Sequence, residues 1–111
     1  MVEIAIIKDR SGRKCGFRCS GHADYFEQGF DIVCSGISAL THTTVLALEQ
    51  LVTLPLQIAT DPETAFLECR WANATAEQQT QADLLLKTMC LGLREIQKQY
   101  PKNLRLRELE V

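Results

Sequence analysis

The chain has 111 residues, of which 46% are hydrophobic and 23% charged, a composition typical of one globular domain spanning residues 1–111. Its formal net charge of −2 argues against broad nucleic-acid binding, which needs a basic surface. No apolar run is long enough to cross a bilayer and the N-terminus lacks a signal-peptide pattern, so we expect a cytoplasmic protein that does not span a membrane.

Two segments near the N-terminus alternate apolar and polar residues, as half-buried β-strands do. The alternation runs over residues 2–7 and again over 14–20, with Ser11-Gly12 as a turn between them. These segments are predicted to form a β-hairpin. Residues 23–30 have no clear period and are predicted to be a loop.

A helical period begins at Asp31, where apolar side chains start to recur every three or four residues. The stripe continues through Leu51 and Val52, and Pro55 is expected to end the element. Asp31 is the predicted N-cap, because its carboxylate can accept hydrogen bonds from the free amides of the first turn.

The second half of the chain contains two further strands, a helix and a last strand. Residues 56–60 and 64–70 are predicted strands around an Asp-Pro-Glu turn. Thr75 and Gln78 fit a capping box that opens the second helix, and Pro101 follows its end.

The C-terminal segment LRLRELEV alternates, with a phase slip between Leu106 and Leu109 that predicts a bulge. The resulting order is ββαββαβ. It favours an α+β two-layer sandwich, with one mostly antiparallel sheet and two long helices packed on one face.

Cys34 is the leading candidate for chemistry. With Asp31 as the cap it is the third helical residue, where the positive end of the helix dipole favours thiolate over thiol. Thiolate is the nucleophilic form of cysteine. The alternative is a small buried side chain that only packs.

A nucleophilic Cys34 needs a base, and the chain has two histidines. His42 lies eight residues further along the same helix, roughly 12 Å along its axis, and is out of reach. His22 follows a strand and precedes a loop, so it can fold back onto the helix start. His22 is therefore the candidate base, although a surface histidine at a strand end remains the alternative.

Other residues around this pair have two possible roles each. Asp31 can cap the helix or orient His22, and Ser38 can join the site or bond back to helix carbonyls. The amides around Cys34 and Ser35 are candidate oxyanion donors. In the loop, Phe26 and Phe30, with Gly29 as a hinge, can form a substrate pocket or anchor in the core.

A zinc site built from Cys15, Cys19, His22 and Cys34 is disfavoured by spacing. Four residues along a strand span roughly 13 Å, too far for Cys15 and Cys19 to share one ion. No phosphate-binding loop, dinucleotide motif or H-E-x-x-H motif is present in the sequence. We therefore expect no metal and no cofactor.

One motif spans the strand end, the loop and the helix start: Gly21-His22-Ala23, Gly29, Asp31-Ile32-Val33-Cys34 and Ser38. This motif, together with the length and the ββαββαβ order, resembles the ribosomal-processing cysteine protease family, Prp. The resemblance covers nearly the whole chain.

The resemblance implies a small cytoplasmic bacterial endopeptidase, usually a homodimer. Its substrate would be the precursor of a large-subunit ribosomal protein, from which it removes an N-terminal extension. His22 would be the general base, Cys34 the nucleophile, and Asp31 and Ser38 supporting residues.

Two other classes of function remain as alternatives. A basic patch on the hairpin, formed by Arg10, Arg13, Lys14 and Arg18, would suit a non-catalytic ribosome-assembly or protein-binding module. A thiol redox sensor would need a resolving thiol beside Cys34, and the sequence has no C-x-x-C motif to provide one.

Overall fold

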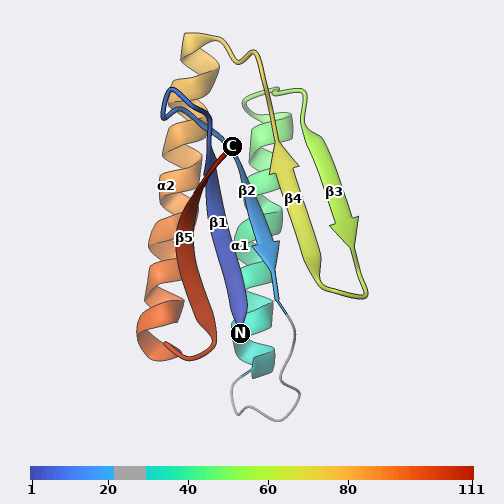
Figure 1. Cartoon of the computed structure of the whole chain (residues 1–111), viewed down its shortest axis with the longest axis vertical. Helices are drawn as coiled ribbons and strands as arrows, with labels where there is room; N and C mark the ends of the chain where they lie inside the picture. The colour runs from blue at the N-terminus through green and yellow to red at the C-terminus, as the bar shows by residue number, and fades with distance from the viewer. Residues whose placement is uncertain (22–29) are drawn as a thin grey trace.

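A computed structural model describes residues 1–21 and 30–111, with side chains described for 1–21 and 32–111. The elements follow the predicted ββαββαβ order (Figure 1). They are β1 (Val2–Lys8), β2 (Lys14–Ser20), α1 (Phe30–Gln50), β3 (Gln57–Asp61), β4 (Phe66–Arg70), α2 (Ala76–Gln99) and β5 (Leu104–Glu110).

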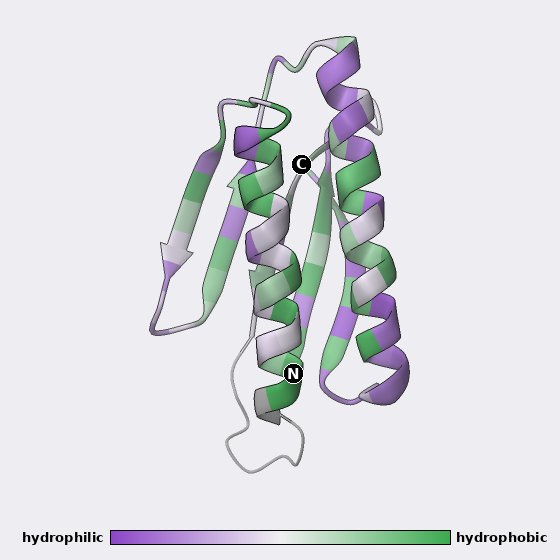
Figure 2. Cartoon of the chain, turned by 180° about the vertical axis from the view of Figure 1, so that it is seen from behind, coloured by the Kyte–Doolittle hydropathy of each residue, from purple (hydrophilic) through white to green (hydrophobic). Residues whose placement is uncertain are grey.

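The strands form one sheet in the order β3-β4-β2-β1-β5. β1 pairs with β5 in parallel, and the other three pairings are antiparallel. Both helices cover the same face, with α1 over the β2–β4 side and α2 over the β1–β5 side (Figures 1 and 2). The predicted two-layer α+β sandwich with a mostly antiparallel sheet is confirmed.

The core lies between the sheet and the two helices. Alternate strand residues such as Ile4 and Phe17 point toward the helices and are fully buried, and Leu48 of α1 and Leu93 of α2 meet them. The helices themselves approach closely at Gly92, where an added Cβ would crowd the Leu40 side chain of α1.

The end of α1 differs from the prediction. The helix stops at Gln50, and Leu51 is 77% exposed instead of continuing the apolar stripe. Thr53 takes a left-handed φ of 59°, which turns the chain so that Val52 and Leu54 are buried. The Leu54 amide donates to the Leu48 carbonyl at 3.1 Å, so the helix ends through this reversal before Pro55 is reached.

The bulge predicted in the last strand is absent. β5 keeps an unbroken parallel register with β1, from Val2 opposite Leu104 to Lys8 opposite Glu110. The apparent phase slip arises because Glu108 occupies an inward-alternating position near the end of an edge strand, where its carboxylate pairs with Lys8 at 3.0 Å. The register shift lies instead in the β1–β2 hairpin, between Ile7 and Lys8.

The long helix α1 is apolar over much of its length. By length and composition alone, its segment Ile32–Gln50 could cross a membrane. A core helix of a soluble protein meets the same criterion, and α1 packs its buried side against the sheet and α2. The expectation that the chain does not span a membrane therefore stays a prediction.

Candidate active site

Cys34 lies in the second turn of α1 and is half-buried against the core. Its neighbour Val33 is 1% exposed and Ile37 is 3% exposed, whereas Ile32 is 67% exposed. Val33 and Ile37 thus fix the rotation of the helix start. This rotation places the Cys34 thiol at the boundary between core and surface.

The start of α1 changes two of the predicted roles. The helix begins at Phe30, so Asp31 is its second residue and not the N-cap, and Cys34 is its fifth residue and not its third. With residue 30 as the first helical residue, the amide of residue 33 is the first with an intrahelical acceptor, so residues 30–32 are the described amides without one. The amides of Cys34 and Ser35 lie past this set, and their use as oxyanion donors stays a prediction.

Several predicted site residues lie outside the described part of the chain. His22, Phe26 and Gly29 are among them, and the side chains of Phe30 and Asp31 are not described either. The structure therefore leaves the pairing of His22 with Cys34, and the contribution of the Asp31 carboxylate, as predictions.

Gly21 is the last described residue before this segment. Its φ is +141°, and an added Cβ would meet the Met1 carbonyl oxygen and the Val2 Cα. Only glycine fits this backbone, because an L side chain would be strained by φ and would also collide with main-chain atoms. Gly21 therefore fixes how the chain leaves β2 and enters the segment that carries His22.

Ser38 is the predicted site residue that the structure does bring next to Cys34. It lies one helical turn further along α1 and is exposed, so it shares the face of the helix on which Cys34 approaches the surface. Its carbonyl accepts a hydrogen bond from Thr41 Oγ1 at 3.4 Å. Ser38 therefore shares an exposed face of α1 with Cys34, and its role in the site stays a prediction.

Cys19 is a neighbour of Cys34 that the sequence did not reveal. Burial, and secondarily the negative charge of the Cys34 thiolate, raise the pKa of Cys19 to about 11. Cys19 sits near the end of β2, on the sheet face that packs against the helices, and both thiols contact the same core cluster. Near neutral pH Cys19 is therefore a protonated thiol beside Cys34.

The described residues contain no group of three metal-ligating side chains close enough to hold an ion. Cys15 and Cys19 belong to the same strand, four residues apart, as the spacing argument assumed. The proposed zinc set also includes His22, which lies outside the described residues, so the expectation of no metal site stays a prediction.

A half-buried cysteine near the start of a core helix, on a two-layer α+β domain, defines a candidate cysteine hydrolase. The family model described as cysteine protease Prp matches residues 1–105. The chain therefore belongs to the Prp family of cysteine proteases.

Two relatives carry the name ribosomal processing cysteine protease Prp. The protein from Staphylococcus aureus strain Mu50 is 31% identical over 106 residues, which cover 96% of this chain and 97% of the relative. The protein from Bacillus subtilis strain 168 is 29% identical over 108 residues, covering 96% of both chains. Similarity therefore extends along essentially the full length of this chain.

Solved structures share the fold, and two of them are peptide complexes. One is the S. aureus Prp protease in complex with a substrate peptide, with a TM-score of 0.84, 29% identity, and coverage of 98% of this chain and 100% of that one. The other is the same protease with a covalently linked product peptide, with a TM-score of 0.80, 30% identity and the same coverage. Together with the family match, they establish the present chain as a cysteine protease, a hydrolase.

Proposed function

We propose that this protein is an endopeptidase that removes the N-terminal extension of a large-subunit ribosomal protein precursor, with Cys34 as nucleophile and His22 as general base. The observation that carries the proposal is the family match over residues 1–105, which includes both residues. The names of the S. aureus and B. subtilis relatives support ribosomal processing as the activity. The solved peptide complexes of the S. aureus protease support a peptide substrate.

The proposed reaction begins with transfer of the Cys34 thiol proton to His22, which leaves a thiolate. The thiolate attacks the scissile carbonyl, His22 returns the proton to the leaving amine, and water hydrolyses the resulting thioester. The positive end of α1 favours the thiolate and the oxyanion. The backbone amides of residues 30–32, which have no intrahelical acceptor, are better donors for the oxyanion than those of Cys34 and Ser35.

The remaining site residues take supporting roles in this proposal. Asp31, which is inside the helix, acts through charge on His22 instead of by capping. Ser38 offers a hydroxyl on the rim of the site. Phe26, Gly29 and the side chain of Phe30 lie outside the described part of the chain, so their role as a substrate pocket or as core anchors stays a prediction.

The protein is also proposed to be a cytoplasmic homodimer. The segment from Ile32 to Leu48 contains no charged residue, although much of it is exposed, and the outer side of α1 is mostly green and pale in Figure 2. Such an uncharged exposed face supports contact with a second copy. Sedimentation of the wild type and of Leu46→Glu, which places a charge on this face, tests the homodimer. A monomeric wild type would contradict it.

The cytoplasmic location is supported by cysteine use. Cys15, Cys19, Cys69 and Cys90 are free thiols, as expected in a reducing compartment. Fractionation of cells that express the protein, followed by detection of the chain, tests the location. Recovery in the membrane or secreted fraction would contradict the proposal.

A binding-module function based on the basic hairpin is not favoured by the structure. Arg18 forms an ion pair with Glu68 at 3.0 Å on the sheet face away from the helices. Lys14 lines a pocket on the helix side of the sheet. The four basic residues therefore do not make one continuous cationic surface.

Intact-mass spectrometry of the ribosomal protein precursor tests the proposed activity. Wild type and the matched control Cys15→Ala are expected to remove one N-terminal segment, and Cys34→Ala and His22→Ala to remove none. Circular dichroism of each variant verifies that it is folded. An uncut precursor with folded wild type would reject this substrate, and cleavage by Cys34→Ala would reject the nucleophile.

A further inference from the structure

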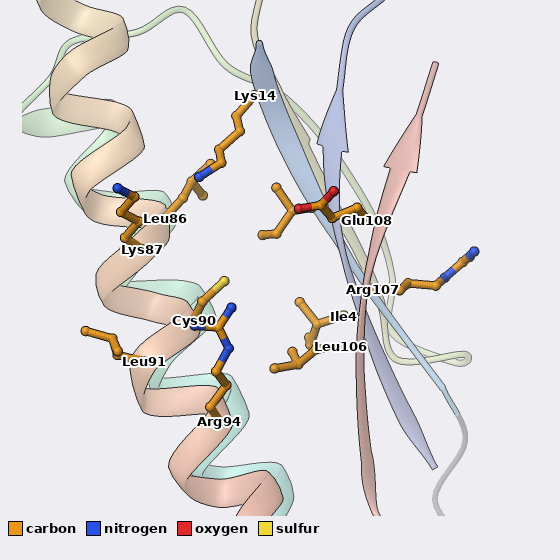
Figure 3. A pocket seen from close by; sticks show the side chains of 11 residues that line it. Ile4, Lys14, Leu86, Lys87, Cys90, Leu91, Arg94, Leu106, Arg107 and Glu108 are labelled. Atoms are coloured by element: carbon orange, nitrogen blue, oxygen red, sulfur yellow. The ribbon is translucent and has the colours of Figure 1, made fainter. Parts of the chain in front are cut away.

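A pocket of about 410 Å³ opens between α2 and the β1–β5 side of the sheet (Figure 3). Its floor is aliphatic, formed by Ile4, Ile6, Leu86 and Leu106. Ligand pockets for small molecules have about this volume, roughly 300–1,000 Å³. The pocket is lined from β1, β2, α2 and β5, so it lies apart from α1 and Cys34.

The rim of this pocket is cationic. Lys14 extends from the sheet toward α2, and Arg94 rises from α2 toward Cys90, so that both basic groups approach the same space (Figure 3). Lys87 adds a third cation from α2. Among the described residues no carboxylate forms an ion pair with any of these three side chains.

Glu108 also lines the pocket, but its carboxylate does not neutralise the basic side chains at the rim. Glu108 is engaged by Lys8 at 3.0 Å. Burial raises the pKa of the half-buried Cys90 thiol and Glu108 adds to this, whereas Arg94 and Lys14 act against the rise. Burial outweighs the two cations, so the Cys90 thiol keeps its proton more readily than an exposed thiol, while Arg94 and Lys14 both act on this position from opposite walls. In a chain with net charge −2, this concentration of positive charge is local.

We propose that this pocket binds a small amphipathic anion, a carboxylate with an aliphatic tail. The tail lies on the aliphatic floor, and the head lies between Lys14 and Arg94. Hydrophobic burial supplies affinity, and charge-assisted hydrogen bonds to the head select an anion over a neutral or cationic amphiphile.

The pocket has an aliphatic side and a cationic side, so its ligand must carry both an apolar tail and a negative charge. A free inorganic anion would leave the partly exposed Leu106 and the exposed Leu91 of the lining in contact with water, and a neutral hydrocarbon would leave Lys14 and Arg94 without a partner. A second copy of this chain, or an acidic peptide that carries a leucine, would satisfy the same chemistry. The volume of about 410 Å³ lies within the range of small-molecule sites and favours the small molecule over either of these.

Decanoate, below its micellar concentration, is the probe for this proposal. Isothermal titration is expected to show binding of decanoate, and site-resolved alkylation by iodoacetamide is expected to show protection of Cys90. Decyltrimethylammonium and decanol, which share the tail, should neither bind comparably nor protect. Cys34→Ala should bind decanoate like the wild type, so the result does not depend on the proposed protease mechanism.

Charge reversals on α2 sharpen the test. Arg94→Glu is expected to weaken decanoate binding by about tenfold or more, since it replaces a charge-assisted donor with a like charge. Lys98→Glu is the matched control, because Lys98 lies on the same helix, pairs with Glu95 and does not line the pocket. It should leave binding unchanged.

Four outcomes would overturn the proposal. They are no binding of decanoate, equal binding of decyltrimethylammonium, equal weakening by Lys98→Glu and Arg94→Glu, and preferential binding of an acidic leucine-containing peptide over decanoate. Sedimentation in the same buffer tests the remaining alternative, in which a second copy of this chain occupies the pocket. A dimer that Arg94→Glu dissociates would assign the pocket to a second copy and reject the small anion.

Discussion

The two helices of this protein begin in different ways. α2 starts with a complete capping box, in which Thr75 Oγ1 accepts from the Gln78 amide at 3.1 Å and Gln78 Oε1 accepts from the Thr75 amide at 2.9 Å. The residues before α1 lie outside the described part of the chain, and within it the start of this helix is held by Val33 and Ile37 in the core. The start of α2 is thus stabilised by its own side chains, whereas the described part of the start of α1 is stabilised by packing against the core.

Among the substitutions that test this comparison, Gly21→Ala is expected to have the largest effect on the free energy of unfolding. We expect Gly21→Ala to lower the free energy of unfolding by about 3 kcal/mol or more, because backbone strain and collision with the N-terminal main chain add. Gly12→Ala is the matched control. Gly12 also has positive φ, +83°, but nothing lies within 4 Å of an added Cβ, so about 1 kcal/mol is expected. Urea denaturation of both variants measures the difference, and equal losses would contradict the collision.

The core anchor of α1 should give the next largest effect. Val33→Ala is expected to cost about 2 kcal/mol of stability, because Val33 is 1% exposed and its methyl groups leave the core. Ile32→Ala, at the 67% exposed neighbouring position, should change stability by no more than about 0.5 kcal/mol. Thermal unfolding separates the two. A large cost for Ile32→Ala in the folded monomer would mean that the rotation of the helix start is different.

The capping box of α2 should contribute less. Thr75→Ala removes the acceptor for the Gln78 amide and is expected to lower the free energy of unfolding by about 1 kcal/mol. Asp31→Ala tests the corresponding place in α1. Because Asp31 lies inside the helix, only its favourable charge near the N-terminus is lost, about 0.5 kcal/mol. A loss for Asp31→Ala as large as that for Thr75→Ala would restore Asp31 as a cap.

Local patterns in the sequence predicted the elements well. The alternation in the β1–β2 hairpin, the apolar stripes of both helices and the Thr75–Gln78 box are short-range features, and the structure has all of them. Local patterns failed at turns that depend on backbone geometry. Nothing in the composition of the α1 end shows that Thr53 takes a left-handed φ, or that Ala65, with φ 53°, delays β4 until Phe66.

The site could be predicted only in part for a related reason. Cys34 stands out in the sequence because it lies at a helix start, and the Gly-His-Ala triplet marks Gly21 and His22. Cys19 beside Cys34, and Lys14 opposite Arg94, depend on how distant segments pack. Residues far apart in the chain and of ordinary type give no local signal, so only the fold reveals that they meet.

The smallest expected effect is the part of the Cys19 pKa shift that comes from Cys34, and it tests whether the thiol of Cys19 in β2 interacts with that of Cys34 in α1. The pKa of Cys19 is raised to about 11 from an ordinary value of 9.0, so folding favours its protonated form. Its contribution to stability is therefore complete below pH 9 and is lost as the pH rises toward 11, because the unfolded chain releases this proton first. Two pKa units correspond to about 2–3 kcal/mol, of which burial supplies the larger part and the Cys34 thiolate the smaller.

A double-mutant cycle isolates the contribution of Cys34 to the Cys19 pKa shift. The free energy of unfolding is measured between pH 8 and pH 11 for wild type, Cys19→Ala, Cys34→Ala and the double variant. The alkaline loss due to Cys19 is the difference between chains with and without it, taken in each Cys34 background, so that the titration of Cys34 itself cancels. We expect this loss to be smaller without Cys34, since burial alone then raises the Cys19 pKa. Equal losses in both backgrounds would show that the Cys34 charge does not reach Cys19, and that the start of α1 stands apart from β2.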